Sequence, residues 1–337
     1  MRPDRFSPIT SRYRSLTSLV VGDIALDRYL HIDPALAETS IETGLPVRNV
    51  VAVRPQAGAG GNVLANLAAL APKHLAAVGF RGDDAEGFEL ARTLETLGVD
   101  LRHFLVRRDR LTFTYTKPLL VRAGRPLEEL SRLDFRSRTP TPPALEDEII
   151  AHLAAAVAQA TVVIAMDQAP EPANGVLTPR IKAALADLAG AHPQKVFIAD
   201  SRTCIGDFRG VRIKTNRSEL ARHFGVAEAG ADVAALAARW SRDMGQDVFV
   251  TLAADGVMAA SGGAVTHVPG IPAPPPIDVT GAGDAALAHI AMALAAGATA
   301  AEAAELGNLA GAVVVRKIGT TGTATVAEIC EVLKRHV

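Results

Sequence analysis

Seven residues, Asp278-Val279-Thr280-Gly281-Ala282-Gly283-Asp284, run directly into an Ala-rich stretch of helical length and could bind an anion. The small residues Gly281, Ala282 and Gly283 let the backbone turn tightly, so that several N–H groups can approach a ligand. The N-terminus of a helix adds a dipole that favours negative charge. A phosphoryl group is therefore the ligand that this segment predicts.

Asp284 ends this segment, and a carboxylate beside an anion site is unfavourable unless it has a chemical task. Accepting the proton of an attacking hydroxyl group is such a task. The sequence therefore predicts Asp284 as a catalytic base, with the backbone of Gly281, Ala282 and Gly283 stabilising the transferred group. The spacing alone leaves open that Asp284 is only a helix cap.

Apolar runs of strand length alternate along the 337 residues with Ala- and Leu-rich stretches of helical length. This alternation predicts an α/β fold with a mainly parallel sheet, and the continuously apolar runs indicate helices on both faces. The predicted central strands are Ser18–Ile24, Leu75–Phe80, Thr161–Met166, Lys195–Asp200 and Asp247–Leu252. The predicted helices include Asp84–Leu97, Gly175–Ala189, Val233–Met244, Asp284–Ala296, Ala300–Val315 and Val326–Lys334.

Two regions lack this rhythm and predict a small β-sheet that projects as a lid. They are Val47–Val53 and Leu101–Phe135, in which β-favouring residues alternate with polar turns. We expect a single domain over residues 17–337 with lid segments at about 26–55 and 101–135, after an N-terminal extension over residues 1–16. The Pro-rich stretches Thr139–Pro143 and Pro269–Pro276 are interpreted as connections.

The composition excludes several classes of protein. Lys+Arg 35 against Asp+Glu 36 gives a formal net charge of -1, which does not indicate a nucleic acid or an acidic membrane as partner. The two cysteines, Cys204 and Cys330, are too far apart in sequence for a disulfide framework or a zinc cluster, and they fit a reducing compartment. The most apolar run, Ala285–Ala296, is too short for a membrane span. We therefore expect a cytoplasmic protein.

The segment Asp278–Asp284 resembles the signature of the ribokinase-like (PfkB) family of carbohydrate kinases. Four other motifs match this family in order and spacing: Gly22–Asp27, Gly58–Asn62 with the following Asn66, Asn216–Glu219, and Lys317–Thr320 after Asn308. The resemblance covers roughly residues 17–335. It implies a three-layer α/β/α Rossmann-type domain and a kinase that uses ATP and Mg²⁺, with a requirement for a monovalent cation such as K⁺ left open.

Within the family the chain most resembles the heptose 7-phosphate kinase subgroup, through Val20–Leu30, Thr114–Lys117 and Ser131–Phe135. The implied acceptor is a sugar or sugar phosphate similar to heptose 7-phosphate. Three segments depart from the pattern and leave the sugar open. Asp167-Gln168-Ala169-Pro170-Glu171 replaces Asp-Tyr-x-Lys-Gly, Ala253 replaces the first Gly of a Thr-x-Gly-x-x-Gly loop, and the small residues around Gly58 stand in a different order.

The resemblance also implies roles for individual residues. The sugar is expected to contact Asp27, Gly60, Gly61, Asn62 and, as a weaker candidate, Asp167. A phosphate on the sugar is expected to meet lid cations, namely Lys117 and Arg132, with Arg122 and Arg125 as further candidates. The nucleotide is expected at Lys214, Asn216, Thr251, Gly256, Asp278 and Asn308. Mg²⁺ is expected at Asn216 and Glu219, mainly through water.

Several alternatives stay open from the residues alone. Asp27 could be a turn former, Asn216 and Glu219 a pair on a helix surface, and each lid cation a solvated charge. The altered segments also allow a catalytically weak relative that senses a sugar or nucleotide. An oxidoreductase is a weaker alternative, because Gly58–Gly61 lacks the G-x-G-x-x-G spacing. The exposed edge of the lid predicts a homodimer.

Overall fold

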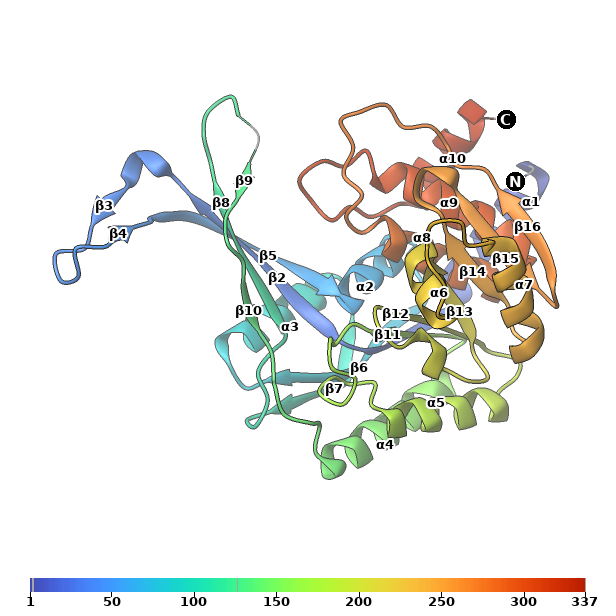
Figure 1. Cartoon of the computed structure of the whole chain (residues 1–337). Coiled ribbons are helices and arrows are strands. Elements are labelled where there is room, and N and C mark those ends of the chain that lie inside the picture. Colours follow the sequence, from blue (N-terminus) through green and yellow to red (C-terminus); the bar gives the residue numbers. More distant parts are fainter. Residues whose placement is uncertain (2, 126, 337) are drawn as a thin grey trace.

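The structure is a computed structural model that describes the chain except for residues 2, 126 and 337 (Figure 1). A nine-stranded sheet forms its centre, and seven of its strands are parallel, whereas β15 and β16 at one edge are antiparallel. The strand order is β16 (Ala264–Val268), β15 (Val257–Ser261), β14 (Val248–Thr251), β13 (Arg212–Asn216), β12 (Val196–Ser201), β11 (Val162–Asp167), β1 (Thr17–Gly22), β6 (His74–Gly82) and β7 (Asp100–Arg107).

Helices cover both faces of this sheet, so the predicted three-layer α/β/α fold is confirmed. Alternate residues of β1 point to opposite faces, with Val20 in one apolar cluster and Leu19 and Val21 in the other. The first cluster receives α1 (Pro3–Ser11), α2 (Gly60–Ala69), α3 (Ala85–Thr96), α8 (Ala282–Ala295), α9 (Ala300–Val314) and α10 (Val326–His336). The second receives α4 (Pro143–Gln159), α5 (Pro179–Ala191), α6 (Arg217–His223) and α7 (Val233–Met244).

The strand order reverses direction at β1. From β1 the chain adds β6 and β7 on one side, and it returns to add β11 and then β12 to β16 on the other. The carboxyl ends of β1 and β11 therefore flank a topological switch point, where open α/β sheets leave a crevice that binds ligands.

A second sheet projects from the central one, as predicted for the lid (Figure 1, left). It contains β2 (Ile24–Ile32), β5 (Val50–Ala59), β8 (Thr114–Leu120), β9 (Glu128–Glu129) and β10 (Leu133–Phe135), and the short pair β3 (Glu38–Thr39) and β4 (Pro46–Val47) continues it outward. The predicted lid boundary at residue 101 is corrected, because residues 101–107 belong to β7. That strand pairs in parallel with β6 and so extends the central sheet.

The described residues before β1 are part of the core, which corrects the expected N-terminal extension over residues 1–16. Phe6, Ile9 and Tyr13 are buried in the first apolar cluster, and Arg5 forms an ion pair with Glu302 at 2.6 Å. Within the described part of the chain, no helix is long and apolar enough to cross a membrane.

Candidate active site

Asp284 lies in the first turn of α8, at the carboxyl end of the central sheet. Gly281 precedes the helix with φ of +79°, and a Cβ atom there would lie 2.5 Å from Cγ2 of Thr321, so the sharp entry requires glycine. The Asp284 carboxylate accepts a hydrogen bond of 3.1 Å from Nδ2 of Asn62 in α2. Among the described residues no backbone N–H donates to it, so Asp284 is not the helix cap.

Two further charged groups surround Asp284. Lys214 of β13 is buried and forms a 2.6 Å ion pair with Asp200 of β12. A Cβ atom on Gly283 would lie 3.1 Å from Nζ of Lys214, so the ammonium group lies against the start of α8. Burial alone would lower the pKa of Lys214, but the carboxylates of Asp200, Glu219 and Asp284 together raise the pKa. Lys214 is therefore a charged donor beside the predicted phosphoryl site.

Burial raises the pKa of Asp284 to about 6, although Lys214 opposes the shift, while Asp200 adds to it. A carboxyl group with this pKa is ionised at neutral pH and is a stronger base than an ordinary aspartate. General bases work best when their pKa lies near the working pH. The arrangement can therefore accept a proton from a hydroxyl group held beside Asp284.

Asn216 and Glu219 form a capping box at the start of α6. The Asn216 side chain accepts the Glu219 N–H at 2.9 Å, and Oε2 of Glu219 accepts the Asn216 N–H at 2.9 Å. This replaces the helix-surface interpretation, because each side chain bonds to backbone. Oε1 of Glu219 has no partner among the described residues. Burial and the nearby Asp200 raise the pKa of Glu219.

The surplus of negative charge at Glu219, Asp200 and Asp284 fits a divalent cation. Among the described residues no three His, Cys, Asp or Glu side chains form a ready-made metal cluster. Mg²⁺ usually keeps several waters and takes only one or two carboxylates from the protein. The free Oε1 atom of Glu219 is compatible with that mode of binding.

Asp27 lies within lid strand β2 and does not end the first strand, so neither the strand-end position nor the turn role applies. Its side chain is buried and forms a 3.1 Å ion pair with Lys117 of β8. A Cβ atom on Gly58 would lie 2.8 Å from its carboxylate carbon, so only glycine fits opposite it. Burial raises the pKa of Asp27, and Lys117 opposes the shift.

Most of the predicted phosphate-binding cations of the lid already have carboxylate partners. Arg132 bonds to both oxygens of Asp134 and stacks on Tyr115 at 4.3 Å. Arg122 pairs with Glu128, and Lys117 pairs with Asp27. These three cations are partly neutralised, which weakens the prediction that they alone hold a phosphate.

Asp167 belongs to the interior of the protein, which argues against the prediction that it contacts the sugar. Only 1% of its surface is exposed. Its carboxylate forms an ion pair with Lys182 at 2.8 Å and accepts the Ser201 hydroxyl at 2.9 Å. The sequence did not identify Lys182 as the partner of Asp167, because the two residues belong to different elements and the side of α5 that faces the sheet was not known.

Gly60 and Gly61 begin α2 and bring it close to the lid. The Gly60 N–H donates to the Asp23 carbonyl at 2.9 Å, and a Cβ atom on Gly61 would lie 2.7 Å from the Ala57 side chain. They place the next residue, Asn62, beside Asp284. The predicted sugar residues Asn62, Gly60 and Gly61 are thus brought to the base by one helix.

The four remaining nucleotide candidates lie at the end of β14, in loops and in α9. Asp278 accepts the N–H groups of Thr280 at 2.9 Å and Gly319 at 3.2 Å, so it joins two of these loops. The other three are Thr251, which donates to the Thr215 carbonyl at 3.2 Å, Gly256, with φ of +97°, and Asn308, which donates to the Pro269 carbonyl at 2.8 Å.

Arg202 is a residue that the sequence analysis missed. It follows β12, it is exposed, and its side chain has no ion pair among the described residues. Burial raises the pKa values of both Asp284 and Tyr115, and the charge of Arg202 opposes these shifts. The sequence could have indicated Arg202, because it is a cation just after the predicted strand Lys195–Asp200 and ligands bind at the carboxyl ends of parallel strands.

Comparisons with known proteins agree with this geometry. The family model described as "pfkB family carbohydrate kinase" matches residues 212–326. The bifunctional protein HldE of Azorhizobium caulinodans is 36% identical over 94% of this chain and 64% of its own length. HldE of Shewanella amazonensis is 32% identical over 94% and 63%. The chain thus spans less than two thirds of the length of these relatives.

Solved structures show the same fold at lower sequence identity. Arabidopsis thaliana ribokinase complexed with ribose and ATP has a TM-score of 0.67 and 19% identity, over 95% of this chain and 99% of that one. Escherichia coli phosphofructokinase-2 in complex with fructose-6-phosphate has a TM-score of 0.66 and 15% identity, also over 95% and 99%. Residues 212–326 thus match the model of pfkB family carbohydrate kinases, most of the chain is similar to the HldE proteins, and its fold is that of the ribokinase and phosphofructokinase-2 structures.

Proposed function

We propose that this chain transfers the γ-phosphoryl group of ATP to a hydroxyl group of a sugar or sugar phosphate, with a heptose 7-phosphate-like sugar as the first candidate. The observation that carries the proposal is Asp284, a partly buried carboxylate at the start of a glycine-preceded helix, hydrogen-bonded to Asn62 and with a raised pKa. The HldE relatives and the subgroup motifs support the choice of sugar.

In this mechanism Asp284 accepts the proton of the attacking hydroxyl group. The N–H groups of Gly283 and Asp284 at the start of α8 and the ammonium group of Lys214 stabilise the negative charge of the group in transfer, whereas the Ala282 N–H donates to the Val279 carbonyl. These donors are fixed before the substrate arrives, so they need no rearrangement during the reaction. The lid excludes water, which would otherwise compete as nucleophile.

The nucleotide would be held by Thr251 at the end of β14, by the loops at Gly256 and Asp278, and by Asn308 of α9. Glu219, through Oε1, and Asn216 would hold Mg²⁺ mainly through water. When bound, the ion offsets phosphate charge. A site with Asp200, Glu219 and Asp284 near one lysine would otherwise repel ATP.

On the acceptor side, Asp27 and Asn62 would orient sugar hydroxyl groups, and Lys117 and Arg132 would add positive charge from the lid. Asn62 bonds to Asp284 and so would link acceptor and base. Asp167 is left out of this set, because Lys182 and Ser201 already occupy its carboxylate.

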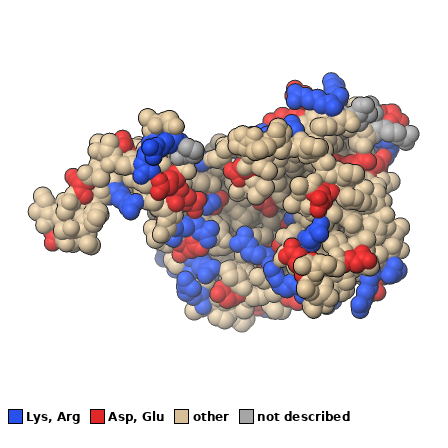
Figure 2. Space-filling view, turned by 45° about the horizontal axis from the view of Figure 1, so that its top comes forward, with Lys and Arg blue, Asp and Glu red and all other residues tan. Residues whose placement is uncertain are grey.

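We further propose a homodimer through the lid. Strand β5 has one free edge, and the lid exposes Val51, Val53 and Leu133 at 53%, 44% and 55%. Its projecting end is mainly uncharged (Figure 2). Pairing of two lids would cover this apolar surface. Light scattering at micromolar concentration tests the proposal, and a monomeric mass would contradict it.

The kinase proposal is tested by ADP release with Mg·ATP and a panel of heptose 7-phosphate, ribose, fructose, fructose phosphates and nucleosides. The wild type should turn over at least one sugar, and Asp284→Asn should lose about 10²–10⁴-fold in kcat. Asp187→Asn, an exposed carboxylate on α5, is the matched control and should keep full activity. No turnover of any acceptor while ATP still binds would overturn the proposal and favour a protein that only binds a sugar or nucleotide.

A further inference from the structure

A small cavity opens over the topological switch point, under the base of the lid. Its wall includes Asp23 after β1, Phe80 of β6, Phe113 before β8, Arg136 after β10, and Pro170 and Asn174 after β11. Its volume is about 40 Å³. Because one water needs about 10–15 Å³ by this measure, the cavity has room for roughly three waters or one group of that size.

Arg136 is the unusual residue of this cavity. Its side chain is half-buried, and Nε is shielded from solvent without a hydrogen-bond partner. The lid cations Lys117, Arg122 and Arg132 all pair with carboxylates, whereas no ion pair of Arg136 is present among the described residues. A shielded guanidinium N–H without an acceptor is unfavourable, so an acceptor from a ligand would stabilise it.

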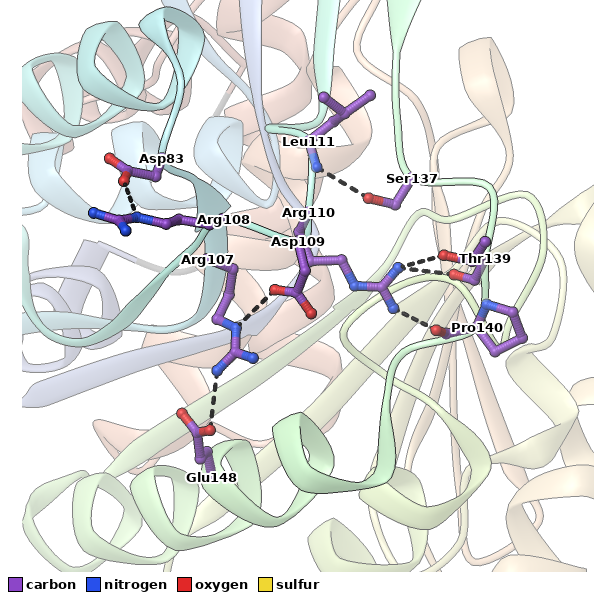
Figure 3. A network of polar contacts seen from close by, with 10 residues as sticks. All are labelled: Asp83, Arg107, Arg108, Asp109, Arg110, Leu111, Ser137, Thr139, Pro140 and Glu148. Atoms are coloured by element: carbon purple, nitrogen blue, oxygen red, sulfur yellow. Dashed lines mark hydrogen bonds and ion pairs between the residues drawn. The ribbon is translucent and has the colours of Figure 1, made fainter.

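The chain segment that carries Arg136 is fixed to the core by Arg110 (Figure 3). Nη1 of Arg110 donates to the carbonyl and hydroxyl oxygens of Thr139 at 2.9 and 3.1 Å, and the Leu111 N–H donates to the Ser137 hydroxyl at 3.1 Å. The connecting segments 108–113 and 136–142, two of the links between lid and core, are therefore held together just beside Arg136. A ligand would meet a guanidinium group whose backbone is already in place.

The opposite wall of the cavity is also fixed. The Thr141 hydroxyl donates to the Gly175 carbonyl at 2.7 Å and so ties this connection to the loop after β11. The Asp23 carboxylate accepts the N–H groups of Gln168, Ala169 and Val176, each at 2.8 Å. Both Asp23 oxygens already have backbone donors, and Asp23 forms no ion pair with Arg136 among the described residues.

Pro170 in this wall stands where the heptose kinase pattern has lysine. The loop therefore contributes no cation of its own but an exposed carboxylate, Glu171, and Arg136 reaches the same cavity from the lid side as its one cation among the described residues. Phe80 and Phe113 supply an apolar wall beside it.

We propose that Arg136 binds a phosphate group at the non-reacting end of the acceptor and selects phosphorylated sugars. This inference rests on the proposed kinase function and assigns the specificity residue of its acceptor site. The guanidinium group donates to the phosphate oxygens, and the phenyl rings contact the carbon chain of the sugar. Lys117 and Arg132 remain with their carboxylate partners.

The test compares kcat/KM for heptose 7-phosphate against heptose, and for ribose 5-phosphate against ribose. Arg136→Met should lose about 10–100-fold on the phosphorylated member of the productive pair, mainly in KM, and less than about twofold on the other member. Arg136→Lys should retain an intermediate preference. Arg138→Met is the control, since Arg138 is exposed two residues along the same segment, and it should leave both values unchanged.

Equal losses on both members of a pair, or no loss at all, would overturn the assignment, because Arg136 would then be structural or uninvolved. Failure of the kinase proposal is a separate result, namely no turnover by the wild type. In that case the phosphate site is tested by calorimetric titration of the wild type and Arg136→Met with heptose 7-phosphate and ribose 5-phosphate. Binding weakened about 10–100-fold by Arg136→Met supports the site, and unchanged or absent binding refutes it. Arg136→Gln replaces Arg136→Met if the latter does not give a folded monodisperse protein.

Discussion

The raised pKa of Asp284 predicts an acid limit to activity at an unusually high pH. Because the pKa is about 6 in place of the ordinary 3.8, about half of the base is protonated at pH 6. Below that point kcat/KM should fall about tenfold per pH unit. At pH 5 the enzyme should keep roughly a tenth of its neutral activity, whereas a base with an ordinary aspartate pKa would keep nearly all of it.

The same raised pKa implies that Asp284 lowers the stability of the folded state at neutral pH. Burial disfavours the ionised carboxylate, so the folded state carries a penalty above pH 6 that disappears as the pH falls towards 4. At about 1.36 kcal/mol for each pKa unit, the full penalty is about 3 kcal/mol. Asp284 keeps some exposure, so we expect about 2 kcal/mol. Asp284→Asn removes the charge and should stabilise the fold by about that amount at pH 7.5, and by almost nothing at pH 4.

Two measurements check this reasoning. The pH profile of kcat/KM between about pH 4.5 and 8 locates the acid limit, and urea unfolding of wild type and Asp284→Asn at neutral and acid pH gives the difference in free energy. Asp187→Asn serves as control and should change neither quantity. The reasoning would be refuted by full activity at pH 5, or by an Asp284→Asn variant that is less stable than wild type at pH 7.5.

Three further changes have defined outcomes. Arg202→Met should move the acid limit of kcat/KM to higher pH, because the nearby cation that lowers the pKa of Asp284 is lost; an unmoved limit would place Arg202 outside the site. Lys182→Met should destabilise the fold by about 3–5 kcal/mol in urea unfolding, because Asp167 would be buried without its partner. Ala59→Gly should stabilise the folded state by about 1 kcal/mol and raise the melting temperature, because Ala59 has φ of +51°, where glycine is favoured. A lower melting temperature would exclude strain at this residue.

Five central strands were predictable because each is a continuous apolar run, as buried parallel strands require. Strand β11 illustrates this, since all six of its residues are buried. Strand β13 was missed, because it contains Arg212, Lys214 and Asn216. The edge strand β7 buries only Phe104 fully and contains Arg102 and His103, so its pattern resembled that of the lid. Helix α4 was missed because it begins at Pro143 in a Pro-rich stretch, although proline is well tolerated in the first turn of a helix.

The site was predictable where one short segment contains the whole geometry. The residues around Asp284 needed only the turn at Gly281 and the helix that follows. Asp167 and Arg136 were not predictable in this way, because their roles depend on partners far along the chain. Asp167 of β11 forms an ion pair with Lys182 of α5. The segment that carries Arg136 is held in place by the hydrogen bonds between Arg110 and Thr139.

Departures from the family pattern coincide with strained backbone in two loops of the proposed site. Ala253, at the position of the first glycine of the nucleotide loop, has φ of +53°, and Ala59, within the reordered small residues, has φ of +51°. These φ values lie in the region where glycine is favoured, and an alanine there costs free energy that the surrounding packing must offset. Ala59 is followed by Gly60, Gly61 and Asn62, and the backbone that it strains therefore positions the side chain that bonds to Asp284. Both alanines thus hold a backbone conformation that favours glycine, which is expected if the conformation itself is needed for binding.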